Sequence, residues 1–230
     1  MLQGIMEMIF DLCYFAIALT VGLILVVKGK TKYFKLFGIM AIVLASGDSF
    51  HLVPRIVSLL GDGMEANAWA LGFGQLITSI TMTIFYVILY FVWELRAKPE
   101  KTTFLRVSII MLALARIIIC CFPQNNWFNL DGNFLFGILR NVPFAIIGII
   151  IIVLSFMQYK QNSDKDYMYM GIAIILSFAF YIPVVLFAGV VPAIGALMIP
   201  KTIAYVWIVM IGFSEHRKFL KQENSDLAVK

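Results

Sequence analysis

Ionisable side chains embedded in apolar sequence are the residues of this chain that can do chemistry. Asp48, His51 and Arg55 are spaced i, i+3 and i+7, so on a helix they fall on one stripe. A carboxylate, an imidazole and a guanidinium on one face can move protons and hold an anionic group. We therefore expect Asp48 and His51 to be catalytic and Arg55 to contact a substrate.

Several ionisable residues lie within apolar runs, where lipid does not stabilise an ionised side chain. Four are basic and two are acidic, namely Arg55, Arg116, Arg140, Lys201, Asp11 and Asp48. An ionised side chain at the bilayer centre costs at least about 2.5 to 3.5 kcal/mol, so such residues usually face the bundle interior and mark a functional site. Their formal sum of +2 predicts a positively charged intramembrane cavity, and its expected partner is a membrane lipid or a small anionic ligand.

Polar side chains of later helices are further candidates for substrate binding. They are Gln75, Thr78, Arg116, Tyr181, Lys201 and Tyr205. For Gln75 and Thr78, hydrogen bonding between helices is an equally good interpretation. For Asp48 and Arg55, the alternative is a structural ion pair that ties one helix to a neighbour.

The composition shows which elements must hold these residues. The chain has 230 residues, of which 62% are hydrophobic and 13% charged, which is typical of a membrane protein. Seven apolar runs are long enough to span a bilayer, near residues 5–27, 36–60, 68–93, 104–122, 135–157, 167–189 and 192–213. We expect an all-α domain of seven transmembrane helices over residues 1–214, which leaves no room for a soluble catalytic or nucleic-acid-binding module.

Basic residues predict the orientation of these helices. Apart from the four within the apolar runs, the 14 others of the 18 Lys and Arg residues fall in alternate loops and in the tail 215–230. By the positive-inside rule, the N-terminus is outside and the basic tail is cytoplasmic. We expect an integral protein of a bacterial-type plasma membrane, without a nucleic-acid partner and with its oligomeric state open.

A faint internal repeat predicts a three-plus-one-plus-three plan. Phe15-Ala16-Ile17 recurs as Phe144-Ala145-Ile146, and the segment 38–44 resembles 171–176. The halves would be residues 5–93 and 135–213 in parallel orientation, with helix 104–122 as the linker. Similar composition of apolar helices explains these matches equally well.

The sequence favours neither a metal nor a cofactor. Two histidines are too few for a histidine-rich metal site, and the three cysteines lack metal or disulfide spacing. Lys201 in the seventh helix is a candidate for binding retinal as a Schiff base, but the third helix has no carboxylate to act as the counter-ion.

One stretch resembles a known family. Gly47-Asp48 followed by Leu52, Pro54 and Arg55 is similar to the Gly-Asp helix of YhhN-type lysoplasmalogenases. Residues 72–91, 171–177 and 200–205 resemble later helices of that family, so the likeness extends over 36–213. The family usually has eight spans, and Phe178 stands where it often has a second acid.

The resemblance implies hydrolysis of the vinyl-ether bond of a lysoplasmalogen, or of a related lysolipid, with Asp48 as acid or base. The alternative is a transporter or binder of small anionic metabolites. Four prolines, Pro54, Pro143, Pro183 and Pro200, offer the kinks by which two halves of a transporter would move.

Overall fold

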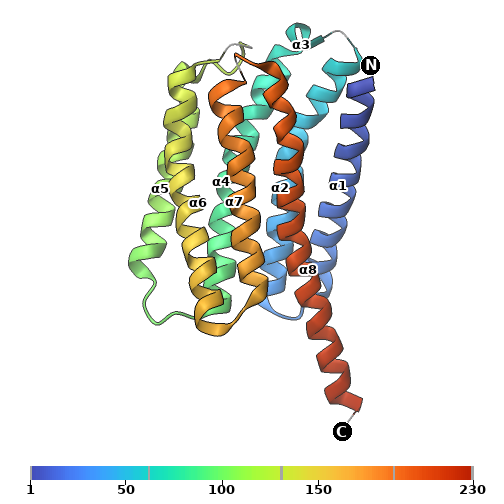
Figure 1. Ribbon diagram of the computed structural model, residues 1–230, viewed down its shortest axis with the longest axis vertical. Coiled ribbons are helices and arrows are strands. Elements are labelled where there is room, and N and C mark those ends of the chain that lie inside the picture. Colours follow the sequence, from blue (N-terminus) through green and yellow to red (C-terminus); the bar gives the residue numbers. More distant parts are fainter. Residues whose placement is uncertain (1, 62, 130–131, 189, 229–230) are drawn as a thin grey trace.

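The protein consists of long helices joined by short loops. The computed structural model describes residues 2–61, 63–129, 132–188 and 190–228. About 90% of the chain is helical, and the described residues contain no strand. The long helices in Figure 1 are α1 (Leu2–Lys28), α2 (Lys32–Leu60), α4 (Ala68–Ala97), α5 (Thr103–Cys121), α6 (Phe134–Asn162), α7 (Lys165–Phe187) and α8 (Met198–Ala228). Short helical turns precede three of them, namely α3 (Gly63–Ala66), η1 (Pro123–Asn125) and η2 (Pro192–Leu197).

Within the described part of the chain, seven helices are long and apolar enough to cross a membrane. The shortest, α5, has 19 residues, close to the roughly 20 that the hydrocarbon core requires. The expected all-α class and the seven candidate spans are therefore confirmed. The helices extend beyond the apolar runs because polar residues continue their ends.

Local signals explain several helix limits. The Thr31 hydroxyl accepts a hydrogen bond from the amide of Phe34 at the start of α2, and the Asn133 side chain does the same for Phe136 at the start of α6. Lys98 and Ser163 adopt left-handed backbone conformations that end α4 and α6. No such signal follows residue 213, and α8 continues as one helix through residues 215–228, which the sequence analysis assigned to the tail.

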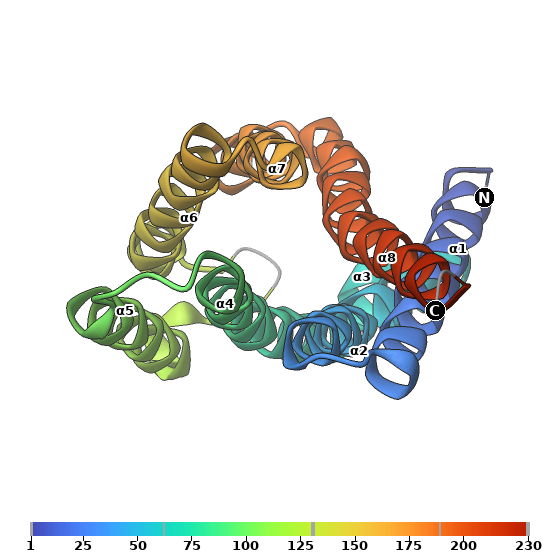
Figure 2. The same ribbon diagram turned by 90° about the horizontal axis from the view of Figure 1, so that it is seen from below.

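The long helices form a ring when viewed along their axes (Figure 2). Each of α2, α4, α5, α6, α7 and α8 packs against the next, and α1 packs against both α2 and α8. Aromatic side chains fill the interior, where the ring of Tyr86 lies 4.8 Å from Phe144 and 5.9 Å from Phe178 between centroids. The ring of helices therefore encloses a packed core.

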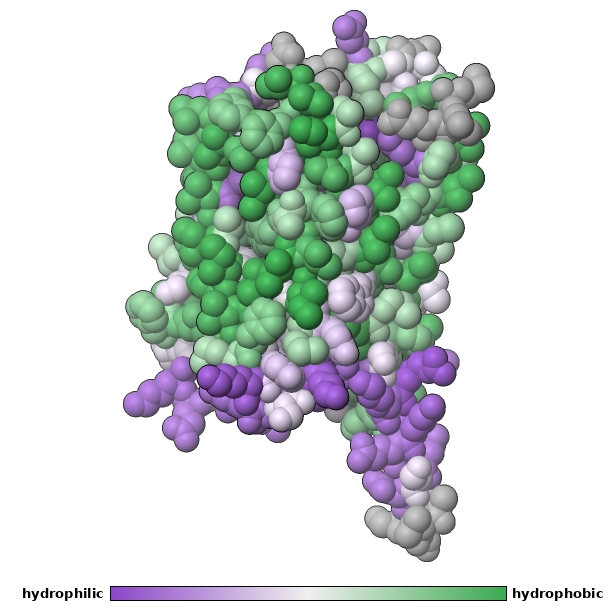
Figure 3. Space-filling model, viewed as in Figure 1, coloured by the Kyte–Doolittle hydropathy of each residue, from purple (hydrophilic) through white to green (hydrophobic). Residues whose placement is uncertain are grey.

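Polar residues gather at the two ends of the bundle, and apolar residues form the belt between them (Figure 3). We call the end with the N-terminus, α3 and η2 the N-terminal end. The other end carries the loops around residues 29–31 and 98–102 and the last half of α8, and we call it the basic end (Figure 1). This distribution is that of an integral membrane protein.

Prolines act differently in α2 and α8. Pro54 lies inside α2, so the carbonyl of Phe50 loses its helical donor. That oxygen lies 2.0 Å from where a Cβ on Gly74 of α4 would be, so only glycine allows this approach. Pro200 lies in the first turn of α8, where no helical hydrogen bond is lost. The interpretation of Pro200 as a kink was therefore wrong.

Candidate functional site

A small cavity near the N-terminal end collects most of the predicted site residues. It measures about 60 Å³ and lies between α1, α2, α4, η2 and α8. Five predicted residues line it, namely Asp48, His51, Arg55, Thr78 and Lys201. One water molecule needs about 10–15 Å³ of such space, so the cavity accommodates a few waters or one small reacting group.

Asp48 is the buried carboxylate of α2 at this cavity. The hydroxyl of Tyr14 on α1 donates a hydrogen bond of 2.8 Å to its Oδ2 atom. Gly47 lets α4 approach, because a Cβ there would lie 1.9 Å from Oγ1 of Thr81. Thr78 of α4 donates to the Gly47 carbonyl at 3.1 Å, so its hydroxyl ties the two helices together beside Asp48.

Arg55 pairs with Glu7 rather than with Asp48. Its Nε lies 2.8 Å from Oε2 of Glu7, and its Nη2 lies 3.3 Å from Oε1. The suggested Asp48–Arg55 ion pair is therefore wrong. Arg55 reaches across to α1 because that helix carries a carboxylate at the same depth, which the sequence analysis did not count among the site residues.

The charge count of the cavity also changes. Glu7, Asp11 and Asp48 line it together with Arg55 and Lys201, which gives a formal charge of −1 when all are ionised. The sum of +2 was wrong for this cavity because it omitted Glu7 and included Arg116 and Arg140, which lie elsewhere. The lining therefore suits a zwitterionic group or a proton-transfer reaction better than an anion.

Lys201 of α8 is buried opposite α2. Its ammonium lies 4.8 Å from the ring centroid of Tyr181 and 5.5 Å from that of Tyr205, distances at which aromatic faces stabilise a cation. Tyr181 and Tyr205 thus contact Lys201 rather than the cavity. The Tyr205 hydroxyl is 3.4 Å from that of Tyr86, and the Tyr181 hydroxyl donates to Asn141 at 3.0 Å.

Arg116 is separate from the cavity. Its side chain is 2% exposed, and its guanidinium carbon lies 3.6 Å above the ring of Phe144. Its Nε and Nη1 atoms have no hydrogen-bond partner. The structure therefore does not bring Arg116 to Asp48, and the cation is stabilised by an aromatic face deep in the bundle.

A second cavity of about 150 Å³ lies beside the first at the N-terminal end. His51 and Arg55 line both cavities, and Gln75 lines only this second one. The Nδ1 atom of His51 is buried without a hydrogen-bond partner. Of the nine predicted residues, six therefore line one or both cavities, two contact Lys201, and Arg116 does neither.

Helix α1 contributes more to the site than Asp11, the one residue of this helix that was expected within the group of charged residues. Glu7, Asp11 and Tyr14 are spaced i, i+4 and i+7, so they share one face of a helix. Glu7 and Asp11 line the first cavity, and Tyr14 holds Asp48. The same stripe rule that selected Asp48, His51 and Arg55 would have found them.

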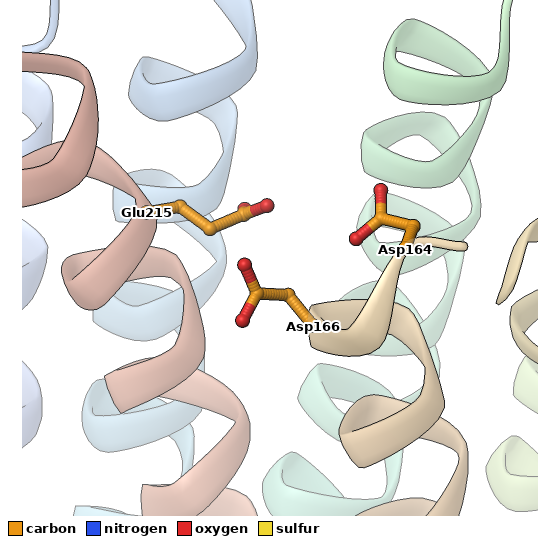
Figure 4. Close-up of side chains that lie close together, drawn as sticks. All are labelled: Asp164, Asp166 and Glu215. Atoms are coloured by element: carbon orange, nitrogen blue, oxygen red, sulfur yellow. The ribbon is translucent and has the colours of Figure 1, made fainter. Parts of the chain in front are cut away.

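A third polar cluster lies at the basic end (Figure 4). The carboxylates of Asp164, Asp166 and Glu215 converge within 4.8 Å of one another. Their counter-charges come from the chain itself, because Arg96 lies 2.9 Å from Asp164 and 3.3 Å from Glu215, and Lys218 lies 2.8 Å from Asp166. Tyr33 also donates a hydrogen bond to Glu215. The cluster therefore ties α2, α4, α7 and α8 together.

The fold and the buried ionisable groups define an integral, polytopic α-helical membrane protein with a polar cavity between its helices near the N-terminal end. Comparisons with protein-family models, with curated proteins and with solved structures gave no match to this chain.

Proposed function

We propose that the protein is a membrane-embedded hydrolase of lysolipids, similar in activity to a lysoplasmalogenase, with Asp48 as its acid and base. The observation that carries this proposal is a buried carboxylate facing a water-sized cavity together with His51 and Lys201. Intramembrane ionisable residues that share a wet cavity are usually functional.

Vinyl-ether hydrolysis needs a proton on carbon and a water molecule nearby. In the proposed reaction, protonated Asp48 gives its proton to the vinyl carbon that does not carry oxygen, which leaves a cation stabilised by the ether oxygen. Water adds to the oxygen-bearing carbon and returns one proton to Asp48. The resulting hemiacetal then breaks its carbon–oxygen bond to the glycerol, which yields an aldehyde and a free hydroxyl group.

The surrounding residues have complementary tasks in this proposal. Tyr14 holds Oδ2 of Asp48, so that the carboxyl group stays oriented towards the cavity. His51 assists the attacking water, and the Lys201 ammonium balances the carboxylate after proton transfer. Arg55 contacts the polar part of the substrate from the boundary between the two cavities.

The size of the cavity indicates how a lipid would approach. Pockets that enclose a drug-sized ligand measure about 300–1,000 Å³, far more than the first cavity. Only the reacting bond would enter, and the hydrocarbon chain would remain in the bilayer. The divergence of α1 and α8 towards the N-terminal end (Figure 1) supports lateral entry between these two helices.

We also propose that the N-terminal end faces the outside of a bacterial-type plasma membrane. Hydrophilic residues gather at the opposite end (Figure 3), and the loops and the last half of α8 there carry most of the Lys and Arg residues, so by the positive-inside rule this end is cytoplasmic. Membrane-impermeant thiol labelling of a cysteine placed at Glu65 tests the orientation. Labelling in intact cells supports it, and labelling only after lysis contradicts it. The parallel repeat stays a prediction.

Transport of a small anion is the second candidate. Asp48, Arg55 and Lys201 line cavities at the N-terminal end, whereas ion pairs link α4, α7 and α8 at the basic end, as in a transporter whose binding site faces one side. Uptake of phosphate into proteoliposomes that is lost in Lys201→Ala would favour this candidate over hydrolysis.

The hydrolase is tested by aldehyde release from a lysoplasmalogen by the purified protein in detergent. Removing a general acid typically costs about 10²–10⁴-fold in rate, so Asp48→Asn should lower aldehyde release at least 100-fold. The matched control Asp226→Asn, exposed near the end of α8, should keep the wild-type rate. Equal rates for the two variants, or no turnover of any lysoplasmalogen by the wild type, contradict the proposal.

A further inference from the structure

The second cavity has the composition of an anion site. It lies between α2, α4, α6 and the segment that joins α5 to α6, and its volume of about 150 Å³ is about ten times what one water molecule needs. Among its described lining residues are Arg55, Arg140 and His51, and none of them is a carboxylate. The first cavity, in contrast, has three carboxylates.

Arg140 is the charge that sets this cavity apart. Arg55 is neutralised by Glu7, but no ion pair among the described residues involves Arg140. Its Nη1 atom donates to the neutral amide oxygen of Asn125 at 2.9 Å, and its guanidinium lies 4.2 Å from the ring centroid of Trp127. A positive charge therefore faces the cavity without a counter-anion from the described part of the chain.

The residues that hold Arg140 are themselves fixed. The amide nitrogen of Asn125 donates to the carbonyls of Ile119 at 2.6 Å and Phe122 at 2.9 Å, which orients its oxygen towards Arg140. The indole of Trp127 donates to the carbonyl of Cys120 at 2.8 Å. The guanidinium is thus preorganised between an oriented acceptor and an aromatic face, as binding sites require.

We propose that this cavity binds a phosphate group. Arg140 pairs with the phosphate oxygens as a guanidinium pairs with phosphate elsewhere, and the imidazole of His51, which lines the cavity, supplies or accepts one further hydrogen bond. Gln75 lies on the wall and offers its amide. Because His51 and Arg55 line both cavities, a phosphate here lies next to the cavity of Asp48.

The proposal assigns the headgroup phosphate of the lysolipid substrate to this cavity, and in that role it rests on the proposed function. Binding itself does not depend on catalysis, so it is measured with the catalytically impaired Asp48→Asn variant as well as with the wild type.

The experiment measures binding to purified protein in detergent by the shift of its thermal unfolding midpoint. Three probes are compared, namely inorganic phosphate, lysophosphatidylethanolamine and a monoacylglycerol without phosphate. Arg140→Gln should weaken binding of the phosphate-bearing probe at least tenfold. Gln75→Glu, which adds a negative charge to a half-open wall without changing the packing, should do the same. The matched control Arg217→Gln, exposed at the basic end, should bind like the wild type.

The outcomes separate the sources of phosphate. Stabilisation by both phosphate-bearing probes supports a general phosphate site, and stabilisation by the lysophospholipid alone supports a headgroup site. Equal binding of the monoacylglycerol, or phosphate binding unchanged in both cavity variants, overturns the proposal. We expect Asp48→Asn to lose aldehyde release and to keep phosphate binding. Phosphate binding and hydrolysis are thus measured independently, so the phosphate site can fail while the hydrolase holds, and the reverse.

Discussion

Arg55 finds its counter-charge far away in the sequence. Glu7 lies 48 positions before it, and the two side chains form a two-point contact between α1 and α2. The guanidinium is half-buried and the carboxylate largely buried. An ion in such a place depends on its partner, because breaking a buried pair leaves a charge without solvation.

Glu7→Gln tests this dependence at the residue scale. The amide keeps the size of the side chain but removes the charge that Arg55 faces. We expect the free energy of unfolding to fall by about 1–3 kcal/mol, less than for a fully buried pair because Arg55 is partly exposed. The measurement is the thermal unfolding midpoint in detergent. Glu65→Gln, at an exposed position of α3, should leave the midpoint unchanged, and an equal effect of both changes would contradict the assignment.

At the scale of elements, glycine positions decide how closely α4 approaches its neighbours. A Cβ on Gly72 would lie 1.7 Å from the carbonyl oxygen of Trp127, which belongs to the segment between α5 and α6. This contact holds the wall of the second cavity against α4. It therefore also sets the position of Trp127 beneath Arg140.

Gly72→Ala should separate that segment from α4. The added methyl group would clash with the backbone carbonyl of Trp127, which cannot move aside as a flexible side chain can. We therefore expect the free energy of unfolding to fall by about 1–3 kcal/mol. Differential scanning fluorimetry in detergent checks it. The control is Gly195→Ala in η2, where a Cβ meets no atom within 4 Å. If Gly72→Ala unfolds no earlier than this control, the close approach to Trp127 is not needed for stability.

The sequence predicted the helices better than the site. The length of each apolar run follows directly from the thickness of a bilayer, so the seven long helices lie where the runs do. Which side chains meet depends on how each helix is rotated about its axis and on the partner it faces. Arg116 and Lys201 both fall in apolar runs, yet α5 turns Arg116 onto Phe144 while α8 turns Lys201 to the cavity.

At the scale of the molecule, the two ends of the bundle have opposite characters. At the basic end, ion pairs connect α4, α7 and α8, with Tyr33 of α2 bound to the same Glu215, and Arg96 and Asp164 also line an open pocket there. The N-terminal end contains both cavities. Any chemistry of Asp48 therefore depends on the arrangement of α1, α2 and α8 at that end, where α1 and α8 diverge (Figure 1).

Both proposed functions require Asp48 of α2 and Lys201 of α8 to share one cavity. A double-mutant cycle of thermal unfolding with Asp48→Asn, Lys201→Met and the double variant tests this most directly. We predict a coupling of about 0.5–3 kcal/mol, with the double variant more stable than the sum of the single effects, because removing both charges leaves neither unpaired. The control cycle of Asp48→Asn with Lys221→Met, at an exposed position of the basic end, should be additive. Additive effects of Asp48→Asn and Lys201→Met would contradict the shared cavity and both functions built on it.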